Sequence, residues 1–207
     1  LFRPAVKGLL WHLPYPIGDP AGAETAEIST IATTRPETML GDSGIAVHPE
    51  DERYTALVGK QVRLPLVGRL IPIVADDYSD PEKGTGAVKI TPAHDFNDFE
   101  VGRRNGLGLI NVLDPEGRML LDGNAAFLDG TSPEPEALAL HGLDRTQARK
   151  ADVDLMEVRG RLRTIEPNTH ADPHGDRSGV VIEPYLTDQW YVNVQPLSAR
   201  VLQDLRD

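Results

Sequence analysis

The sequence contains no cysteine, and this absence excludes several kinds of protein. Without thiols the chain has neither a disulfide framework nor a thiolate zinc site. Aromatic residues make up only 5%, so the stacking platforms of barrels that grip single-stranded RNA are scarce. No run approaches the ~20 apolar residues that span a bilayer, and no signal-peptide core is present. We therefore expect a cytoplasmic protein with no membrane contact.

Basic residues are also few, with 21 Lys and Arg against 32 Asp and Glu and a net charge of −11. Nucleic-acid-binding surfaces are normally basic, so this balance argues against a protein that grips nucleic acid along its length. Solubility is the simpler explanation of the acidity. A domain that holds only one end of an RNA, with other domains gripping the rest, need not be basic overall.

Short strand-like segments dominate the first 120 residues, and 17 Pro and 19 Gly supply turns between them. The pattern predicts an α+β, β-rich fold with a barrel-like, bent sheet and a few short helices. The predicted strands are Val6–Leu13, Ile28–Thr33, Gly44–Val47, Gln61–Leu66, Arg69–Ala75, Ala87–Thr91 and Leu109–Leu113. The predicted helices are Pro49–Leu57, Asp95–Asn105 and Asp144–Gly160, the last with a capping box between Asp144 and Gln147.

A soft boundary follows the last predicted helix. We expect a core over residues 1–160 and an extended return segment over 161–207, with extended stretches at Arg161–Ile165, Val180–Ile182 and Gln189–Val194. The chain lacks an initiating Met, and its last residues form a helical pattern that stops short. We therefore expect a monomeric fragment of a larger cytosolic protein.

Two polar motifs carry most of the functional information. In the first, Thr33, Thr34 and Arg35 close an apolar strand, and Pro36 holds Arg35 in an extended conformation. The alternative interpretation is an ordinary Thr-rich strand end. Asp42 follows shortly afterwards and is either a turn residue or part of the same pocket.

The second motif runs from Gly84 to Asp98 and combines a Gly-Thr-Gly turn, a strand and a helix start. Lys89 and Thr91 alternate with apolar residues, so their side chains share one face of the strand. Asp95 and Asp98 lie three residues apart on one exposed helix face, where paired carboxylates could receive an ammonium group. The alternatives are a solvated strand face, a hairpin turn, and carboxylates that cap the helix and complement its dipole.

A cluster over residues 170–176, with His170, Asp172, His174 and Asp176, has the composition of a metal site but not the spacing of a known motif. We expect no metal and no cofactor in this chain. Gly-x-Ser-x-Gly is also absent, so a serine nucleophile of the hydrolase type is not expected.

Together the two motifs resemble the editing domains of the class I aminoacyl-tRNA synthetases for valine, leucine and isoleucine. The valyl type is the most similar: the first motif reads Thr-Thr-Arg-Pro-Glu-Thr-Met-Leu-Gly-Asp from Thr33 to Asp42, and the second continues from Lys89 to Gly102. The tail resembles the valyl type as well, at Arg177–Pro184 and Asp188–Tyr191. The ATP-site signatures His-x-Gly-His and Lys-Met-Ser-Lys-Ser are absent, so ATP binding would belong to the rest of the parent enzyme.

The resemblance implies hydrolysis of a mischarged threonyl ester on tRNA(Val), with threonyl-adenylate as a further substrate. The partners implied are the 3′ end of the aminoacyl-tRNA, the threonine moiety and the rest of the synthetase. Asp98 would hold the α-amino group. Lys89, Thr91 and Asp95 would line the threonine side of the site, and Thr34 and Arg35 would line the ribose side. The resemblance thus assigns catalytic roles to Thr34, Arg35, Lys89 and Asp98, and substrate binding to Thr33, Asp42, Thr91, His94 and Asp95. The attacking water would be positioned by hydroxyls, backbone groups and the vicinal ribose hydroxyl.

Three alternatives stay open at this point. A leucyl- or isoleucyl-type editing domain would share the architecture with another substrate. A non-catalytic RNA-binding barrel would need more aromatic residues. A metal-dependent hydrolase would need the cluster over residues 170–176 to bind an ion.

Overall fold

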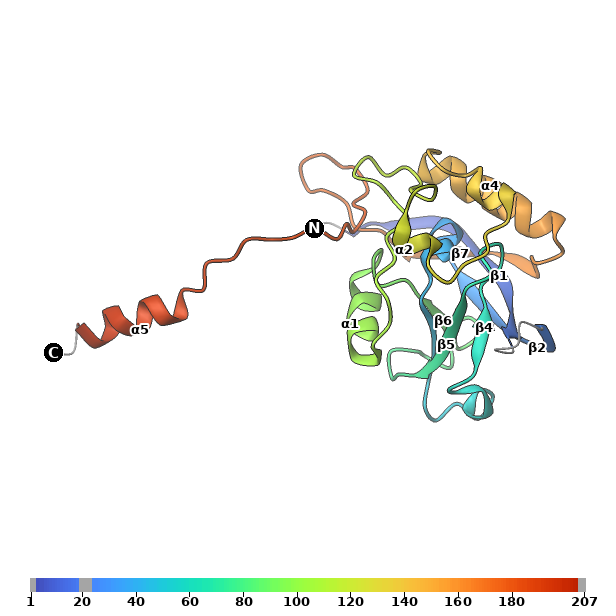
Figure 1. Ribbon diagram of the computed structural model, residues 1–207, viewed down its shortest axis with the longest axis horizontal. Helices are drawn as coiled ribbons and strands as arrows, with labels where there is room; N and C mark the ends of the chain where they lie inside the picture. The colour runs from blue at the N-terminus through green and yellow to red at the C-terminus, as the bar shows by residue number, and fades with distance from the viewer. Residues whose placement is uncertain (1–2, 19–23, 205–207) are drawn as a thin grey trace.

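A computed structural model of the chain describes residues 3–18 and 24–204 and is built around one mixed sheet (Figure 1). Within these residues the sheet has seven strands, in the order β2-β1-β4-β5-β3-β6, with β7 paired to β1. The strands are β1 (Ala5–Gly18), β2 (Glu24–Thr33), β3 (Gly44–Val47), β4 (Gln61–Arg63), β5 (Leu70–Ala75), β6 (Ala87–Ile90) and β7 (Thr164–Ala171). Only the β3–β5 pair is parallel; the other pairs are antiparallel.

The sheet curls until its two ends come close together. β2 and β6 stand at opposite ends of the strand order, yet they are in contact. No ladder joins them in the described part of the chain. The sheet is therefore a nearly closed barrel with a gap between β2 and β6, which confirms the predicted fold class.

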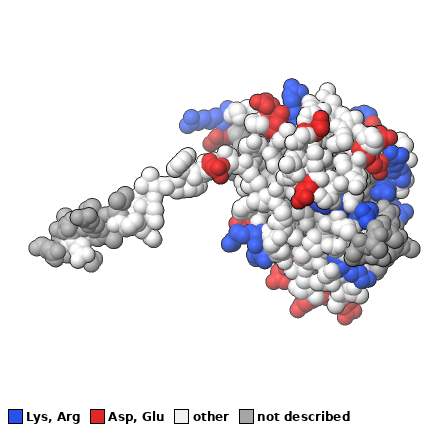
Figure 2. Space-filling model, viewed as in Figure 1, with Lys and Arg blue, Asp and Glu red and all other residues white. Residues whose placement is uncertain are grey.

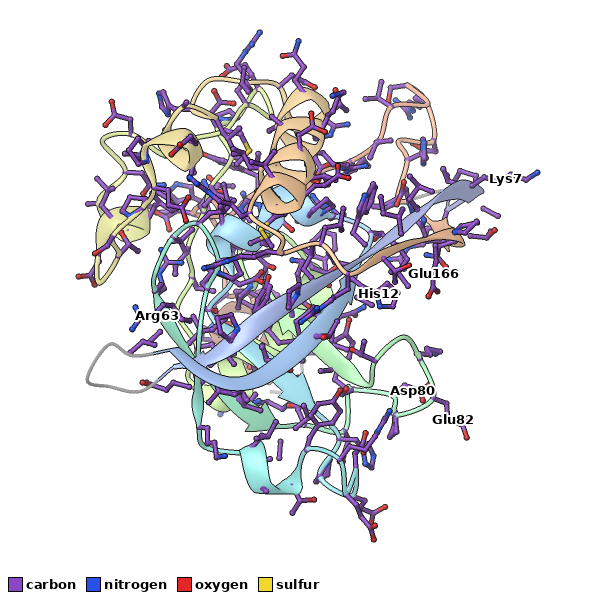
Figure 3. All side chains as sticks on the ribbon, turned by 90° about the vertical axis from the view of Figure 1, so that its right-hand side faces the viewer. Lys7, His12, Arg63, Asp80, Glu82 and Glu166 are labelled. Atoms are coloured by element: carbon purple, nitrogen blue, oxygen red, sulfur yellow. The ribbon has the colours of Figure 1, made fainter. Side chains whose placement is uncertain are left out.

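The long strand β1 pairs with three strands, β2, β4 and β7, and Figure 3 shows β7 lying along it. Its second half pairs with β2, from Trp11 opposite Thr33 onwards, and its first half pairs with β7, from Ala5 opposite Ala171 to His12 opposite Thr164. His12 Nε2 lies 3.4 Å from Glu166 Oε1 across the β1–β7 pair. The end of the predicted extended stretch, residues 164–165, is thus the start of the longer strand β7, because it pairs with the edge of β1.

The helices are short, and polar side chains begin several of them. They are α1 (Phe96–Asn105), α2 (Ala125–Leu128), α3 (Pro135–Leu138), α4 (Arg145–Val158) and α5 (Gln195–Asp204), with 3-10 turns η1 (Pro36–Gly41) and η2 (Thr55–Leu57). Asp144 caps α4, but it accepts hydrogen bonds from the backbone N–H and the hydroxyl of Thr146 at 2.9 and 2.5 Å. The predicted capping box with Gln147 is not formed.

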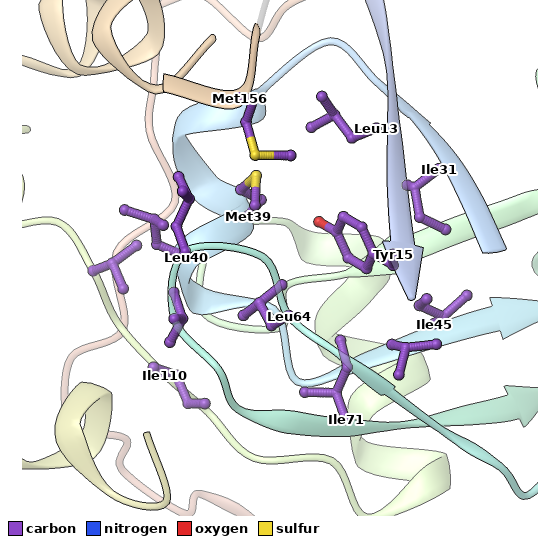
Figure 4. Close-up of a cluster of buried hydrophobic side chains, with 14 of the residues drawn as sticks. Leu13, Tyr15, Ile31, Met39, Leu40, Ile45, Leu64, Ile71, Ile110 and Met156 are labelled. Atoms are coloured by element: carbon purple, nitrogen blue, oxygen red, sulfur yellow. The ribbon is translucent and has the colours of Figure 1, made fainter. Parts of the chain in front are cut away.

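The main core lies inside the curled sheet and is closed on one side by η1 and α4 (Figure 4). Leu13, Tyr15, Ile31 and Ile71 come from the strands and are fully or almost fully buried. From the covering elements, Met39 and Leu40 of η1 and Met156 of α4 complete the packing. Dense packing makes such interiors resist deformation, so η1, which directly follows Arg35 of the first motif, is held firmly in place.

Two predicted elements are wrong. The helix predicted over 49–57 is only the single turn η2. The strand predicted over 109–113 is an extended segment with one isolated bridge, Leu113 to Met119, because no strand lies alongside it. Predicted strand 61–66 is also shorter, since Leu64 begins a turn in which its N–H bonds the carbonyl of Arg69 at 2.8 Å.

Beyond Pro184 the chain leaves the body as an extended run that ends in α5 (Figure 1). Trp190 in this run is 100% exposed. The division into residues 1–160 and 161–207 stays a prediction, although β7 belongs to the sheet. Of the described helices, none has the length and apolar character to cross a membrane.

Candidate active site

The two polar motifs meet at the gap between β2 and β6, where they enclose a cavity of about 210 Å³. This is smaller than the ~300–1,000 Å³ typical of sites for drug-sized ligands, so it suits a small group. Its walls come from β1, the end of β2, η1, β6 and the start of α1. The lining residues are Leu10, Ala32, Thr33, Thr34, Arg35, Thr38, Val88, Lys89, Thr91, His94, Asp95 and Asp98.

The first motif turns sharply at Arg35 and is tied to the second. Arg35 has φ −132° and ψ 67°, outside the helical region, and Pro36 begins η1 directly after it. The backbone N–H of Arg35 donates to Thr33 Oγ1 at 3.0 Å. Its guanidinium Nη1 donates to the carbonyl of His94 at 2.8 Å, so the two motifs are joined across 59 residues of sequence.

A buried network of polar side chains forms one wall. Lys89, 8% exposed, donates from Nζ to Thr38 Oγ1 at 2.9 Å, to Asp42 Oδ1 at 3.2 Å and to Thr91 Oγ1. Thr91 Oγ1 donates to Asp42 Oδ1 at 2.6 Å. The predicted shared face of Lys89 and Thr91 is therefore correct. The alternative of a solvated strand face is wrong, because both residues are buried.

Asp42 holds this wall from behind and does not line the cavity itself. It is fully buried, and Tyr15 donates its phenolic hydroxyl to Oδ2 at 2.7 Å. Burial raises the pKa of Asp42, while Lys89, Thr91 and Tyr15 oppose that shift. Removing a single partner from such a buried ion pair leaves an uncompensated charge, so the network is stable only when all its members are present.

The two carboxylates of α1 have different roles. Asp95 caps the helix: its Oδ1 accepts from the N–H of Asn97 at 2.7 Å and of Asp98 at 3.1 Å. Asp98 is only 6% exposed, so the expectation that it lies on an exposed helix face is wrong. The helix start packs onto the end of β6, where Asp98 Oδ2 accepts from the N–H of Thr91 at 2.9 Å. Burial raises the pKa of Asp98 to about 7.

His94 is a neutral side chain of fixed orientation. Its Nε2 accepts the backbone N–H of Val112 at 2.9 Å. Burial, together with Arg35 and Lys89, lowers the pKa of His94 to about 3. An imidazole with so low a pKa is a poor proton acceptor at neutral pH, so His94 contributes hydrogen bonding and shape.

The Gly-Thr-Gly turn supports the site from a distance. Gly84 and Gly86 have φ of +55° and +77°, which favour glycine, and neither lines the cavity. Tyr54 donates its hydroxyl to the carbonyl of Thr85 at 2.7 Å. The turn lies in the loop between β5 and β6, which are not neighbouring strands in the sheet, so the hairpin-turn alternative is wrong.

His170 and Asp172 line a second hollow beside the cavity, which is described below. Among the residues that the structure describes, no three His, Asp or Glu side chains are grouped as metal ligands. A metal-free site stays a prediction. On the face drawn in Figure 2, acidic and basic side chains are interspersed, as expected for a chain that does not grip nucleic acid along its whole surface.

Several residues of the site were not predicted from the sequence. Thr38 and Leu10 line the cavity, and Tyr15 supports Asp42. Glu37 is fully buried and accepts two hydrogen bonds from Arg149 of α4, at 2.8 and 2.7 Å. Of these residues, only Thr38 could have been found in the sequence, because it follows the Thr-Thr-Arg-Pro run by two residues. The contacts of Leu10, Tyr15 and Glu37 depend on tertiary structure.

The arrangement can bind a small ligand that carries a cation next to oxygen atoms. A buried carboxylate faces the cavity beside an ammonium and two hydroxyls, and a guanidinium stands at the rim. In a low-dielectric site such groups interact more strongly than in water. They can recognise an α-amino group on one side and a hydroxyl or ester oxygen on the other.

Comparison with known families gives a match to the profile described as "Leucyl-tRNA synthetase, editing domain" over residues 50–156. The valine–tRNA ligase of Brucella suis biovar 1 is 59% identical over 210 residues, and that of Rhodopseudomonas palustris is 60% identical over 207 residues. These alignments cover 98% and 97% of this chain. They cover 23% and 21% of the two ligases, so the chain spans about a fifth of their length.

Two solved structures share the fold. One is a crystal structure of GlLeuRS-CP1, with a TM-score of 0.54 and 13% identity over 76% of this chain and 99% of that one. The other is the ternary complex of Agrobacterium radiobacter K84 agnB2 LeuRS with tRNA and LeuAMS, with a TM-score of 0.53 and 18% identity over 86% of this chain and 24% of that one. At such low identity these structures support the fold alone.

Proposed function

Since the chain belongs to the editing-domain family of the class I aminoacyl-tRNA synthetases, we propose that it hydrolyses the threonyl ester of mischarged tRNA(Val). Its similarity to valine–tRNA ligases along nearly its whole length supports the valyl type. An apolar valine pocket cannot strongly reject threonine, a limit already known for valyl-tRNA synthetases. A second site must therefore recognise the hydroxyl and remove the product. Threonyl-adenylate is a further substrate of the same chemistry.

The observation that carries this proposal is the small cavity with a buried carboxylate opposite buried hydroxyls. Asp98 pairs with the α-amino group of the threonyl moiety. Thr38, Lys89 and Thr91 face its side chain, and the hydroxyl oxygens of Thr38 and Thr91, which already accept from Lys89, keep a further lone pair for the hydroxyl of threonine. A valyl group cannot make this hydrogen bond, which is worth about 1 kcal/mol.

The ribose lies at the rim, against Thr34 and Arg35. Both line the cavity and the adjoining hollow, so they stand where an ester would connect the amino acid to the nucleotide. Thr33 and Asp95 shape this rim, His94 fixes Arg35 through its carbonyl, and Asp42 holds Lys89. The solved LeuRS complex with tRNA has the same fold, which agrees with a tRNA 3′ end as partner.

In the reaction, a water oxygen attacks the ester carbonyl and the bond from that carbon to the ribose oxygen breaks. One proton of the water goes to the ribose oxygen and the other to bulk water, so the ribose leaves with a free hydroxyl and the amino acid as a carboxylate. His94 is a poor base, and Asp98 is engaged by the ammonium, so neither accepts the water proton. The vicinal ribose hydroxyl and the hydroxyls at the rim position the water, which makes orientation the main source of rate.

Other parts of the proposal concern the parent protein. Amino-acid activation with ATP, the remaining tRNA contacts, a cytoplasmic location and a monomeric fragment stay predictions. Because the matching family profile is of the leucyl type, a leucyl-type substrate is the alternative that needs a direct comparison.

The decisive experiment measures deacylation by the chain with four charged tRNAs: Thr-tRNA(Val), Val-tRNA(Val), Ile-tRNA(Leu) and Leu-tRNA(Leu). We expect the threonyl ester to be hydrolysed about 10-fold faster than the valyl ester, because the hydroxyl of threonine makes a hydrogen bond that valine lacks, and about 1.4 kcal/mol corresponds to a factor of ten. We expect the same rate in EDTA. Preference for the mischarged leucyl tRNA would establish the leucyl type instead, and activity lost in EDTA but restored by zinc would overturn the metal-free mechanism.

The pH dependence provides a second test. With a pKa of about 7, Asp98 gains its charge as the pH rises through neutrality, so the KM for the threonyl ester should fall several-fold between pH 6 and 7.5. This window lies below the α-amino pKa of about 8, so the ligand keeps its charge. A KM that stays constant over this range would contradict the pairing of Asp98 with the amine.

The same titration affects stability with a defined sign. The folded pKa of Asp98 lies above its ordinary value of 3.8, so its contribution to stability is complete below pH 4 and is lost as the pH rises through 7. Asp98→Asn, which does not titrate, should remove this component. Unfolding free energies of both proteins at pH 5 and pH 8 measure it.

A further inference from the structure

A second hollow of about 360 Å³ adjoins the first cavity and shares Thr34, Arg35 and Asp95 with it. Its walls bring together basic side chains from four separate parts of the chain. These residues are Arg3, Arg35, Arg145, Arg149 and His170, and the acidic residues beside them are Asp95, Asp172 and Glu183. Such a wall is suited to an anion that lies next to the ester.

The arginines of this hollow are not equally available. Arg149 is held by the bidentate contact with the buried carboxylate of Glu37. Arg35 and Arg145 share one acidic partner instead. Glu183 Oε2 contacts Arg35 Nη2, and Glu183 Oε1 lies 2.9 Å from Arg145 Nε. A single carboxylate thus bridges the guanidinium of the first motif and a guanidinium of α4.

Glu183 is placed there by a small hairpin. The N–H of Gly175 donates to the carbonyl of Val180 at 2.9 Å, and the N–H of Ile182 donates to the carbonyl of Pro173 at 2.8 Å. Glu183 follows directly, with its side chain 17% exposed. Burial raises its pKa, while Arg35 and Arg145 oppose that shift. The carboxylate is therefore presented into the hollow by defined backbone contacts.

We infer that Glu183 is an internal competitor that occupies Arg35 and Arg145 until a phosphodiester of the RNA strand displaces it. Carboxylates and phosphates bind guanidinium groups in the same bidentate manner, so one can replace the other. The phosphodiester next to the acylated ribose is the anion that would reach this hollow when the ester lies in the first cavity. The inference rests on the proposed function for the identity of that ligand.

The direction in which Glu183→Gln changes RNA affinity shows whether Glu183 competes with the RNA or only orients Arg35. If Glu183 competes, Glu183→Gln releases Arg145 and the Nη2 side of Arg35, which keeps its contacts with the carbonyl of His94 and with Glu37, and RNA binding becomes tighter. If Glu183 only orients Arg35, the same change loosens Arg35, and neither RNA affinity nor its salt dependence increases. Gln keeps the shape and a hydrogen-bonding oxygen, so the hairpin is retained.

The experiment titrates the RNA trinucleotide CCA into the wild-type chain, Glu183→Gln and Asp176→Asn by calorimetry at 50 and 200 mM salt. Asp176 is exposed on the same hairpin, so Asp176→Asn is a control for the change in net charge. We expect Glu183→Gln to bind CCA about 5-fold or more tightly than Asp176→Asn. Its log Kd should depend more steeply on log salt, by about 0.7, the value for one added phosphate contact on a single strand.

A second variant tests the mechanism of the gain. In Arg145→Met/Glu183→Gln one of the freed cations is removed, so the affinity should fall back toward the wild-type value. Equal affinity in Glu183→Gln and Asp176→Asn would overturn the inference. That result is separate from a failure of the proposed function, which would appear as no threonyl-tRNA hydrolysis by the wild-type chain, whatever CCA binding shows.

Discussion

Replacing Asp98 by asparagine is expected to lower the rate of threonyl-tRNA hydrolysis by about 10²-fold while the domain still folds. The amide keeps an oxygen that can accept the N–H of Thr91, so the contact between α1 and β6 survives. What is lost is the charge that pairs with the substrate ammonium, and hydrogen bonds to charged groups contribute about 1.5–3 kcal/mol. Steady-state deacylation and a thermal melt measure the two effects.

Asp95→Asn is the matched control for this change. Asparagine caps helices as well as aspartate does, so the start of α1 should be preserved. Asp95 uses its Oδ1 for that cap, and we expect a smaller loss of activity than for Asp98→Asn. Equal activity of Asp98→Asn and the wild-type chain would rule out Asp98 as the ammonium partner.

Lys89→Ala is expected to abolish hydrolysis and also to cost about 3–5 kcal/mol of stability. The stability loss arises because the buried carboxylate of Asp42 is left without its cation. Lys89→Ala is therefore not expected to affect the rate alone. Chemical denaturation and deacylation assays report the two losses.

A double variant separates the loss of stability from the loss of activity. Asp42→Asn/Lys89→Met removes both charges, so it should recover most of the stability but none of the activity. Ile90→Val is the control on the same strand, since Ile90 packs in a separate apolar cluster; it should cost about 0.5–1.5 kcal/mol and leave the rate intact. Activity in the double variant would show that Lys89 acts only through stability.

The sequence predicted the parts of this site that depend on local rules. Alternation put Lys89 and Thr91 on one face, the cap identified the start of α1, and Pro36 excluded helical geometry at Arg35. Each of these follows from the period of a strand or from backbone sterics over a few residues. Resemblance then brought the two motifs together across about fifty residues.

The remaining contacts depend on how the sheet curls. The burial of Asp98 arises because α1 packs on the end of β6, and Asp42 is supported by Tyr15 from β1, 27 residues away. The pairing of β7 with β1 spans even more of the chain. No periodicity in a single segment encodes such contacts, which is why Asp98 was predicted to be exposed and Glu37 was not noticed.

The strand β6 has no face that is turned to solvent over its whole length. Lys89 lies in the polar network, whereas Val88 and Ile90 pack with Ala46 and Val101 in the separate apolar cluster. A shift of one residue would exchange the two sets and place an ammonium among aliphatic groups. Insertions and deletions should therefore be absent from residues 87–91 in active descendants of this chain. In the loop before them Figure 3 shows Asp80 and Glu82 at the surface, and we expect this exposed part to tolerate changes in length without moving the polar wall.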